Sequence, residues 1–247
     1  MKTAFITGAT AGIGEACARK FIADGWQVVG TGRRKDRLDA LAQELGEKFL
    51  PIVSDMRDIE DLGRIVRQLP DAFAGIDLLV NNAGLAPPMT DFQDADLDKQ
   101  LNAMRTNMDG LVAITRHLLP TLIERKGAIV NLASVAGSYP YRGGAVYGAT
   151  KAFLTQFSLS LRSDLHGTGV RVTSIEPGMV ETEFTIVRTE GNRQASEQLY
   201  ADMNPMTAGD IANTIHWVAT QPAHLNINRL ELMPTSQSFA GFSVHRD

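Results

Sequence analysis

Cysteine and long apolar runs are both scarce in this chain. Among 247 residues there is one cysteine, Cys17, so no disulfide bond can form within a single chain. Its neighbours are apolar, and we expect Cys17 to lie in the core. No stretch comes near the roughly 20 consecutive apolar residues that a membrane-spanning helix requires. We therefore expect neither a disulfide-stabilised scaffold nor a protein that spans a membrane.

An excess of one charge and clusters of metal ligands are also lacking. Lysine and arginine number 24, aspartate and glutamate number 28, and the basic residues are scattered. Proteins that bind nucleic acid or anionic membranes concentrate basic residues, so we expect neither partner. The five histidines show no metal-ligand spacing, and no metal site is predicted. The first residues lead directly into an expected strand without a secretory leader, which favours the cytoplasm.

What the chain does contain is a regular alternation of short apolar strands and helices. Strands are expected at residues 4–7, 27–31, 49–54, 76–80, 128–133, 170–175 and 229–233. Strand–helix alternation is typical of a parallel sheet covered by helices on both faces. The hydrophobic content of 44% and the length suit one core. We predict a single α/β domain over residues 1–247, with a doubly wound parallel sheet.

A glycine-rich turn joins the first expected strand to the first expected helix. It reads Thr7-Gly8-Ala9-Thr10-Ala11-Gly12-Ile13-Gly14. Glycine lets the backbone approach a phosphate, and the following helix N-terminus offers free N–H groups and the positive end of a dipole. A tight turn without a ligand has the same pattern. The position between the first strand and the first helix favours a dinucleotide site.

Arg33 and Arg34 follow the second expected strand. Folds that bind NAD usually place an acid here, to bind the ribose 2′-hydroxyl, and this chain has none. Guanidinium groups suit a 2′-phosphate instead. A solvated basic cap before the next helix is the alternative interpretation. Together with the glycine turn, the two arginines predict NADP rather than NAD.

The third and fourth expected strands end in further candidates for this site. Asp55 and Met56 follow the third strand, where Asp55 could accept a hydrogen bond from the adenine amino group or simply cap a helix. The fourth strand is followed by Asn81-Asn82-Ala83-Gly84, whose small residues suit either close passage beside a cofactor or a simple turn. Ligands bind at the carboxyl ends of parallel strands, so we expect both segments at the cofactor site.

Three side chains in residues 134–151 offer acid–base chemistry. Ser134 follows an expected buried strand, and Tyr147 and Lys151 are four residues apart, on one face of an expected helix. A phenol titrates near pH ~10, and a neighbouring ammonium favours the phenolate and lowers that pKa. Ser134 could hydrogen-bond a reacting oxygen while Tyr147 exchanges a proton with it. On its own, the pair could also be a surface tyrosine beside a lysine.

Asn107 and Gly110 lie within an expected helix that begins in the acidic stretch 91–98 and ends at Pro120. Both residue types are unfavourable inside a helix. We therefore predict a local distortion of the helix near Lys151.

The motifs resemble those of the short-chain dehydrogenase/reductase family over essentially the whole chain. The resemblance implies a Rossmann-type sheet of about seven strands and a homotetramer. It implies a catalytic tetrad of Asn107, Ser134, Tyr147 and Lys151, in which Lys151 also binds the nicotinamide ribose. It further implies that the nicotinamide is lined by Asn81 and by residues 177–182, which include Pro177, Gly178, Val180 and Thr182.

A narrower resemblance concerns the substrate. Residues 137–141, 164–168, 222–228 and 233–238 resemble the NADP-dependent 3-hydroxy acid dehydrogenase group, which includes malonic semialdehyde and sulfoacetaldehyde reductases. Arg142 departs from the carboxylate-using branch and adds a cation, which favours a sulfonate. We predict NADPH-dependent reduction of a small anionic aldehyde, sulfoacetaldehyde to isethionate. The alternatives are a 3-hydroxy acid or serine dehydrogenase, a malonic semialdehyde reductase, a non-catalytic dinucleotide-binding protein and an extended-family epimerase.

Residues 182–206 form a long polar segment, which predicts a lid over the substrate. Arg188 within it could clamp a carboxylate or sulfonate, or could be a solvated loop charge. Tyr141, Gln237 and Phe242 are further substrate candidates. The tail, residues 234–247, has apolar side chains that should become buried, and we expect it to pack against another subunit and close the substrate site.

Overall fold

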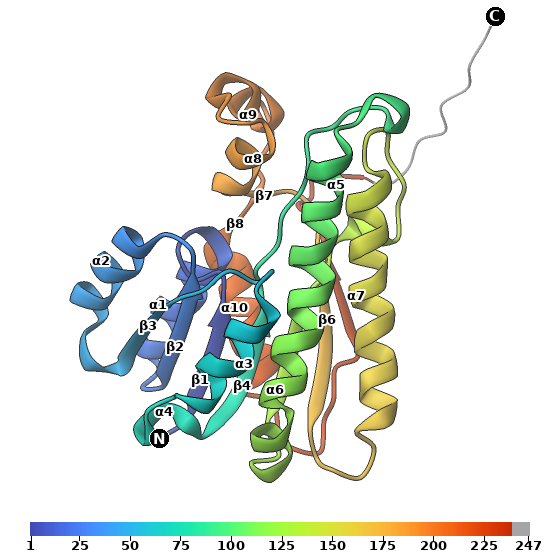
Figure 1. The fold of residues 1–247 in the computed structure, drawn as a ribbon. Coiled ribbons are helices and arrows are strands. Elements are labelled where there is room, and N and C mark those ends of the chain that lie inside the picture. The colour runs from blue at the N-terminus through green and yellow to red at the C-terminus, as the bar shows by residue number, and fades with distance from the viewer. Residues whose placement is uncertain (239–247) are drawn as a thin grey trace, which may run out of the picture.

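The computed structural model describes residues 1–238 (Figure 1). Seven parallel strands form one sheet in the order β3-β2-β1-β4-β5-β6-β9. The strands are β1 (Thr3–Thr7), β2 (Gln27–Gly32), β3 (Phe49–Val53), β4 (Ile76–Asn81), β5 (Ala128–Leu132), β6 (Arg171–Pro177) and β9 (Arg229–Leu232). The predicted doubly wound Rossmann-type sheet is thus confirmed. Phe242 and most of the tail lie outside the described residues.

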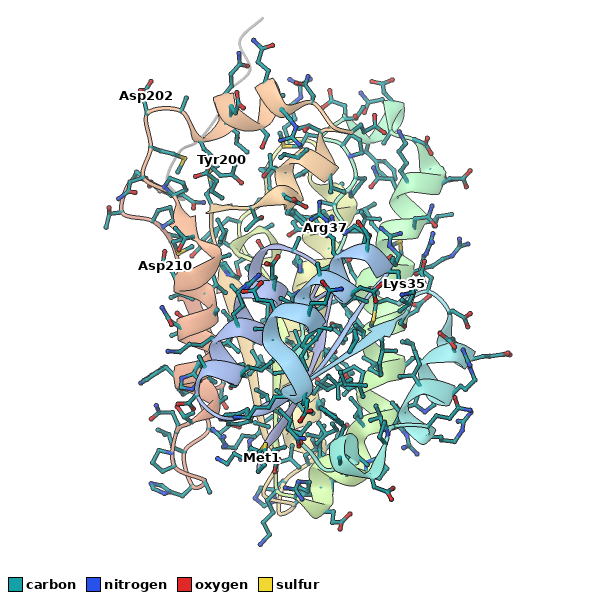
Figure 2. The ribbon with its side chains drawn as sticks, turned by 90° about the vertical axis from the view of Figure 1, so that its left-hand side faces the viewer. Met1, Lys35, Arg37, Tyr200, Asp202 and Asp210 are labelled. Carbon is teal, nitrogen blue, oxygen red and sulfur yellow. The ribbon has the colours of Figure 1, made fainter. Side chains whose placement is uncertain are left out.

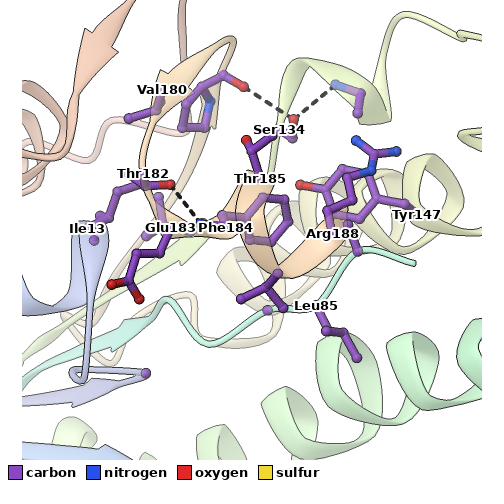
Figure 3. Close-up of a pocket in the computed structure, with 18 of the residues that line it drawn as sticks. Ile13, Leu85, Ser134, Tyr147, Val180, Thr182, Glu183, Phe184, Thr185 and Arg188 are labelled. Carbon is purple, nitrogen blue, oxygen red and sulfur yellow. Dashed lines mark hydrogen bonds between the residues drawn. The ribbon is translucent and has the colours of Figure 1, made fainter. Parts of the chain in front are cut away.

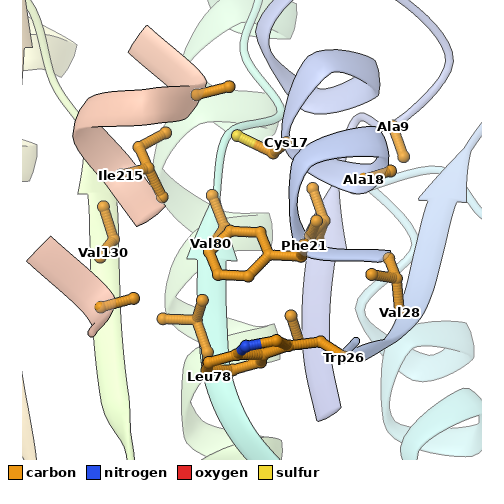
Figure 4. Close-up of a cluster of buried hydrophobic side chains, with 14 of the residues drawn as sticks. Ala9, Cys17, Ala18, Phe21, Trp26, Val28, Leu78, Val80, Val130 and Ile215 are labelled. Atoms are coloured by element: carbon orange, nitrogen blue, oxygen red, sulfur yellow. The ribbon is translucent and has the colours of Figure 1, made fainter. Parts of the chain in front are cut away.

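Helices cover both faces of the sheet. One face carries α1 (Gly12–Ala23), α2 (Lys35–Leu45) and α10 (Ala208–Ala219), whose apolar residues join one core cluster with β1, β2, β4 and β5. The other face carries α3 (Ile59–Arg67), α6 (Gly110–Glu124) and α7 (Ala145–Asp164). Figure 4 shows Phe21 between Cys17 and Trp26, and Cys17 is fully buried as predicted. The inner strands β1, β4 and β5 are therefore buried on both faces, which explains their continuous apolar runs in the sequence.

Shorter elements connect these layers. They are α4 (Asp71–Ala74), α5 (Leu97–Met104), α8 (Glu183–Arg188), α9 (Arg193–Tyr200), and the paired strands β7 (Val180–Glu181) and β8 (Met206–Thr207). The predicted lid therefore contains two helices, which stand above the sheet in Figure 1. Within the described part of the chain, no helix combines the length and the apolar character needed to cross a membrane.

The helix around Asn107 is distorted, as predicted. Residues Arg105–Asp109 form a π-helical turn between α5 and α6. The predicted end at Pro120 is wrong, because α6 continues to Glu124. Pro120 is exposed, and the buried residues Leu118 and Leu122 on either side of it hold the helix against the sheet. This packing offsets the loss of one backbone hydrogen bond at proline.

Gly14 is required by the close approach of α1 to the preceding turn. A Cβ at this position would lie 2.3 Å from the carbonyl oxygen of Gly8 and 2.5 Å from Nδ2 of Asn82. We expect Gly14→Ala to lower the free energy of unfolding by about 1–3 kcal/mol, because the backbone must shift to admit the methyl group. Gly209→Ala is the matched control, since its Cβ would meet only Thr207 Oγ1 at 3.5 Å. Equal thermal stability of the two variants would contradict this packing argument.

Candidate active site

A cavity of about 1080 Å³ opens where the strands of the sheet end. Its walls come from the glycine turn, the segments that follow β2, β4, β5 and β6, and the lid helices α8 and α9. Figure 3 shows this region with Ser134, Tyr147 and Arg188 around it. Many of the predicted site residues line the cavity. They are Gly8, Thr10, Gly12, Ile13, Arg33, Arg34, Asp55, Met56, Ala83, Gly84, Ser134, Tyr141, Tyr147, Lys151, Pro177, Gly178, Val180, Thr182, Arg188 and Gln237.

Thr7, Gly14, Asn81 and Asn107 lie behind this surface. Thr7 Oγ1 accepts hydrogen bonds from the backbone N–H groups of Asn82 and Ala83, both at 3.0 Å, and so holds the turn after β4. Asn81 is expected to line the nicotinamide, but it is not among the residues that line the cavity. Its amide is buried in the core, where Nδ2 donates to Asn131 Oδ1 at 2.8 Å and to Thr115 Oγ1 at 2.9 Å, while Oδ1 has no hydrogen-bond partner among the described residues.

Asn107 is positioned by the π-helical turn and bonds to both sides of the site. Its Nδ2 donates to the carbonyl of Leu85 at 2.9 Å and to Thr150 Oγ1 at 3.0 Å, and its Oδ1 accepts from the N–H of Leu85 at 2.7 Å. Thr150 is adjacent to Lys151 on α7. Asn107 therefore fixes the cavity wall at Leu85 relative to the helix that carries the tyrosine and the lysine.

Ser134, Tyr147 and Lys151 converge at the ends of β5 and α7. The Nζ of Lys151 lies 5.6 Å from the centroid of the Tyr147 ring and donates to the carbonyl of Leu132 at 2.6 Å. Ser134 Oγ donates to the carbonyl of Pro177 at 3.2 Å and accepts from the N–H of Ala136 at 3.2 Å. Tyr147 and Lys151 are buried, so the tertiary structure disfavours a surface tyrosine beside a lysine.

Burial dominates the electrostatics of this pair. It raises the pKa of Tyr147, with Tyr141 adding to the effect and Arg188 and a hydrogen bond with Ser134 opposing it. Burial also lowers the pKa of Lys151 to about 8. The predicted lowering of the phenol pKa by the lysine is therefore not what this structure gives, because desolvation penalises the charged form of both groups. Near neutral pH, Tyr147 is a protonated phenol that can donate its proton.

Arg188 of the lid lies over the candidate catalytic tyrosine. Its guanidinium carbon is 5.4 Å from the centroid of the Tyr147 ring and 5.5 Å from that of Tyr141. Its Nη2 donates to Tyr141 Oη at 2.9 Å, and its Nε to the carbonyl of Pro87 at 3.3 Å. Phe184, which sequence reasoning missed, places its ring 5.9 Å from that of Tyr147. The segment 182–206 thus brings one cation and one aromatic ring to the Tyr147 phenol.

Comparisons with known proteins identify the family. A family model described as short chain dehydrogenase matches residues 2–193. The chain belongs to the short-chain dehydrogenase family. A serine 3-dehydrogenase of Rhizobium radiobacter is 60% identical over 245 residues, which cover 99% of this chain and 98% of that protein. A sulfoacetaldehyde reductase of Chromohalobacter salexigens is 51% identical over 246 residues, with 98% of each chain covered.

A solved structure described as the closed form of serine dehydrogenase complexed with NADP+ superimposes on this short-chain dehydrogenase with a TM-score of 0.97. The two are 48% identical, and the match covers 99% of this chain and 100% of the other. The predicted cofactor, NADP, and the predicted class of enzyme, a dehydrogenase acting on CH–OH groups, are thereby confirmed.

The residues of this short-chain dehydrogenase fit NADP. Gly8 and Gly12 have φ angles of 73° and 55°, which place the turn in a conformation suited to glycine. Arg34 lines the cavity and donates from Nη2 to Thr10 Oγ1 at 2.9 Å, so its guanidinium lies beside the glycine turn. Arg33 is exposed at the cavity wall. Sequence reasoning missed Arg37, although its i,i+3 spacing from Arg34 places both on one face of α2.

Two substrate candidates differ from expectation. Gln237 lines the cavity, but its Oε1 accepts the N–H of Met179 at 2.7 Å. Arg142 does not line the cavity, its side chain is 87% exposed, and its Nε donates to Asp91 Oδ1 at 2.7 Å. The argument for a sulfonate from Arg142 is therefore wrong, since that cation is paired with Asp91 away from the site.

Proposed function

We propose that this dehydrogenase oxidises a short 3-hydroxy acid, with serine as the best candidate, and reduces the corresponding aldehyde in the reverse direction. The alcohol loses a hydride to NADP+ and a proton, which yields the aldehyde, NADPH and H+. Two comparisons support this choice over sulfoacetaldehyde. The serine 3-dehydrogenase is 60% identical to the chain, whereas the sulfoacetaldehyde reductase is 51% identical.

The observation that carries the proposal is the position of Arg188. The guanidinium of Arg188 lies 5.4 Å from the centroid of the Tyr147 ring, so it can bind a substrate anion close to the proton donor. A guanidinium binds a carboxylate with two parallel hydrogen bonds, which fixes the orientation of the substrate as well as its charge. A short hydroxy acid thus presents its hydroxyl to Tyr147 when its carboxylate is held by Arg188.

The other residues act on the reacting oxygen and the cofactor. During reduction, Tyr147 donates its phenol proton to the reacting oxygen. During oxidation it first releases that proton to solvent and then, as the phenolate, accepts the proton of the hydroxyl, while Ser134 hydrogen-bonds the same oxygen. Lys151 binds the nicotinamide ribose, and Asn107 positions α7 relative to the cavity wall. The bound nicotinamide accepts or donates the hydride. The homotetramer and the packing of the tail against another subunit stay predictions.

A panel of alcohols with NADP+ tests the proposal. We expect kcat/KM for L-serine and 3-hydroxypropionate to exceed that for isethionate by about tenfold, and that for neutral 1-propanol by about 10²-fold, because the neutral alcohol forms no charged hydrogen bond with Arg188. Formation of NADPH is followed by its absorbance. A higher kcat/KM for isethionate would instead support the sulfonate reaction, and no turnover of any alcohol or aldehyde would support a non-catalytic binding protein.

A further inference from the structure

The lid begins with an acid that is paired with two arginines at the adenosine end of the cavity. Oε2 of Glu183 accepts hydrogen bonds from Arg37 Nη1 at 2.6 Å and from Arg34 Nη1 at 3.1 Å. The arginines belong to the start of α2, far from α8 in sequence. Figure 3 shows Glu183 at the start of α8, and Figure 2 shows Arg37 beneath the lid helices. The acid therefore joins the lid to α2.

The same arginines face the glycine turn. Arg34 donates from Nε and Nη2 to Thr10 Oγ1, and Arg37 donates from Nη1 to the carbonyl of Thr10 at 3.5 Å. Thr10, Arg34 and Glu183 all line the cavity. The side chains of the two arginines and the glutamate are 39–44% exposed, so a ligand can reach them. The pairing thus occurs on the surface where the 2′-phosphate of NADP is expected.

The Glu183 carboxylate and a cofactor phosphate would compete for the same guanidinium groups. Both anions bind arginine through hydrogen bonds to the same N–H donors. Each donor that Glu183 occupies is withdrawn from a phosphate, and the two anions repel each other. A ribose 2′-hydroxyl carries no charge and does not compete with Glu183 for these guanidinium groups.

We propose that Glu183 is a specificity-determining residue that competes with the cofactor 2′-phosphate for Arg34 and Arg37. It weakens NADP(H) binding and thereby moderates the preference for NADP over NAD. Arg188 lies at the opposite end of the same short helix. The competition at Glu183 therefore also affects the position of Arg188, the proposed substrate-binding arginine. Binding of the 2′-phosphate releases the start of α8 from α2.

Two nucleotides that differ only in the 2′-phosphate test the proposal by calorimetry. They are adenosine 2′,5′-bisphosphate and adenosine 5′-monophosphate. We expect Glu183→Gln to bind the bisphosphate about three- to fivefold more tightly than the wild type, with the affinity for the monophosphate unchanged. The substitution keeps the size of a half-exposed side chain, and thermal unfolding verifies that the variant is folded. No substrate is involved, so the result is independent of the proposed reaction.

Glu190→Gln is the matched control, because Glu190 also lies in the lid but pairs with Lys99 on α5. We expect it to bind both nucleotides as the wild type does. Glu183→Asp keeps the charge on a shorter side chain and should bind the bisphosphate with an affinity between those of the wild type and Glu183→Gln. Unchanged or weaker binding of the bisphosphate by Glu183→Gln would overturn the proposal. Equal tightening of both nucleotides would overturn it as well.

Discussion

Replacement of Tyr147 by phenylalanine is expected to lower kcat by about 10²–10⁴-fold, since positioned acid–base catalysis contributes on that scale. The phenol is buried beside Lys151 and shares a hydrogen bond with Ser134. The variant keeps the ring, and with it the contacts to Phe184 and Arg188. We therefore expect the affinity for NADPH to stay within about twofold of the wild type, because the phenol hydroxyl supplies chemistry rather than most of the binding.

Tyr139→Phe is the control for this prediction. Tyr139 also lines the cavity, and the substitution removes the same atom, which donates to Glu231 at 3.2 Å. Steady-state turnover of serine with NADP+ and fluorescence titration with NADPH separate catalysis from binding. A Tyr147→Phe enzyme that retained turnover close to that of Tyr139→Phe would show that the proton is carried by another group.

Replacement of Arg188 by alanine has the second largest expected effect. We expect KM for serine and 3-hydroxypropionate to rise by about 10- to 100-fold, which corresponds to the loss of a charged hydrogen-bonded pair. The KM for 1-propanol should change little. Arg188→Lys should restore part of the affinity for the acids, because it keeps the charge but loses the two-pronged geometry. Steady-state kinetics with each alcohol at saturating NADP+ measures the difference.

Arg142→Ala is the matched control for Arg188. Arg188 donates to the Tyr141 hydroxyl, and Arg142 follows Tyr141 in the sequence. Arg142, however, is paired with Asp91 outside the cavity. We expect its kinetics with every alcohol to match those of the wild type. An equal rise in KM for acids and neutral alcohols in Arg188→Ala would mean that Arg188 packs the lid without binding the substrate anion.

Local spacing predicts much of this site. The glycine turn lies between a strand and a helix that are contiguous in sequence, and Tyr147 and Lys151 share one helix face because of the helical period. The unfavourable residues at positions 107 and 110 predict the distortion that the π-helical turn confirms. These features depend on residues near one another in the chain, so composition and periodicity are enough to find them.

Tertiary contacts account for what the sequence could not predict. The pairing of Glu183 with Arg37 joins residues 146 apart, and it exists only because the lid folds over α2. The outward direction of Arg142 and the inward direction of Asn81 depend on neighbours that no local pattern specifies. The raised pKa of Tyr147 follows from burial, which overrides the attraction expected from a neighbouring ammonium.

Transfer of deuterium from serine to the cofactor is the most direct measurement of the central claim. Serine in which deuterium replaces both hydrogens on the hydroxymethyl carbon is incubated with the enzyme and NADP+. The NADPH formed is analysed by mass spectrometry. Oxidation at that carbon predicts one deuterium in each NADPH molecule, and no NADPH with Tyr147→Phe over the same time. Unlabelled NADPH, or none with the wild-type enzyme, would contradict the proposed reaction.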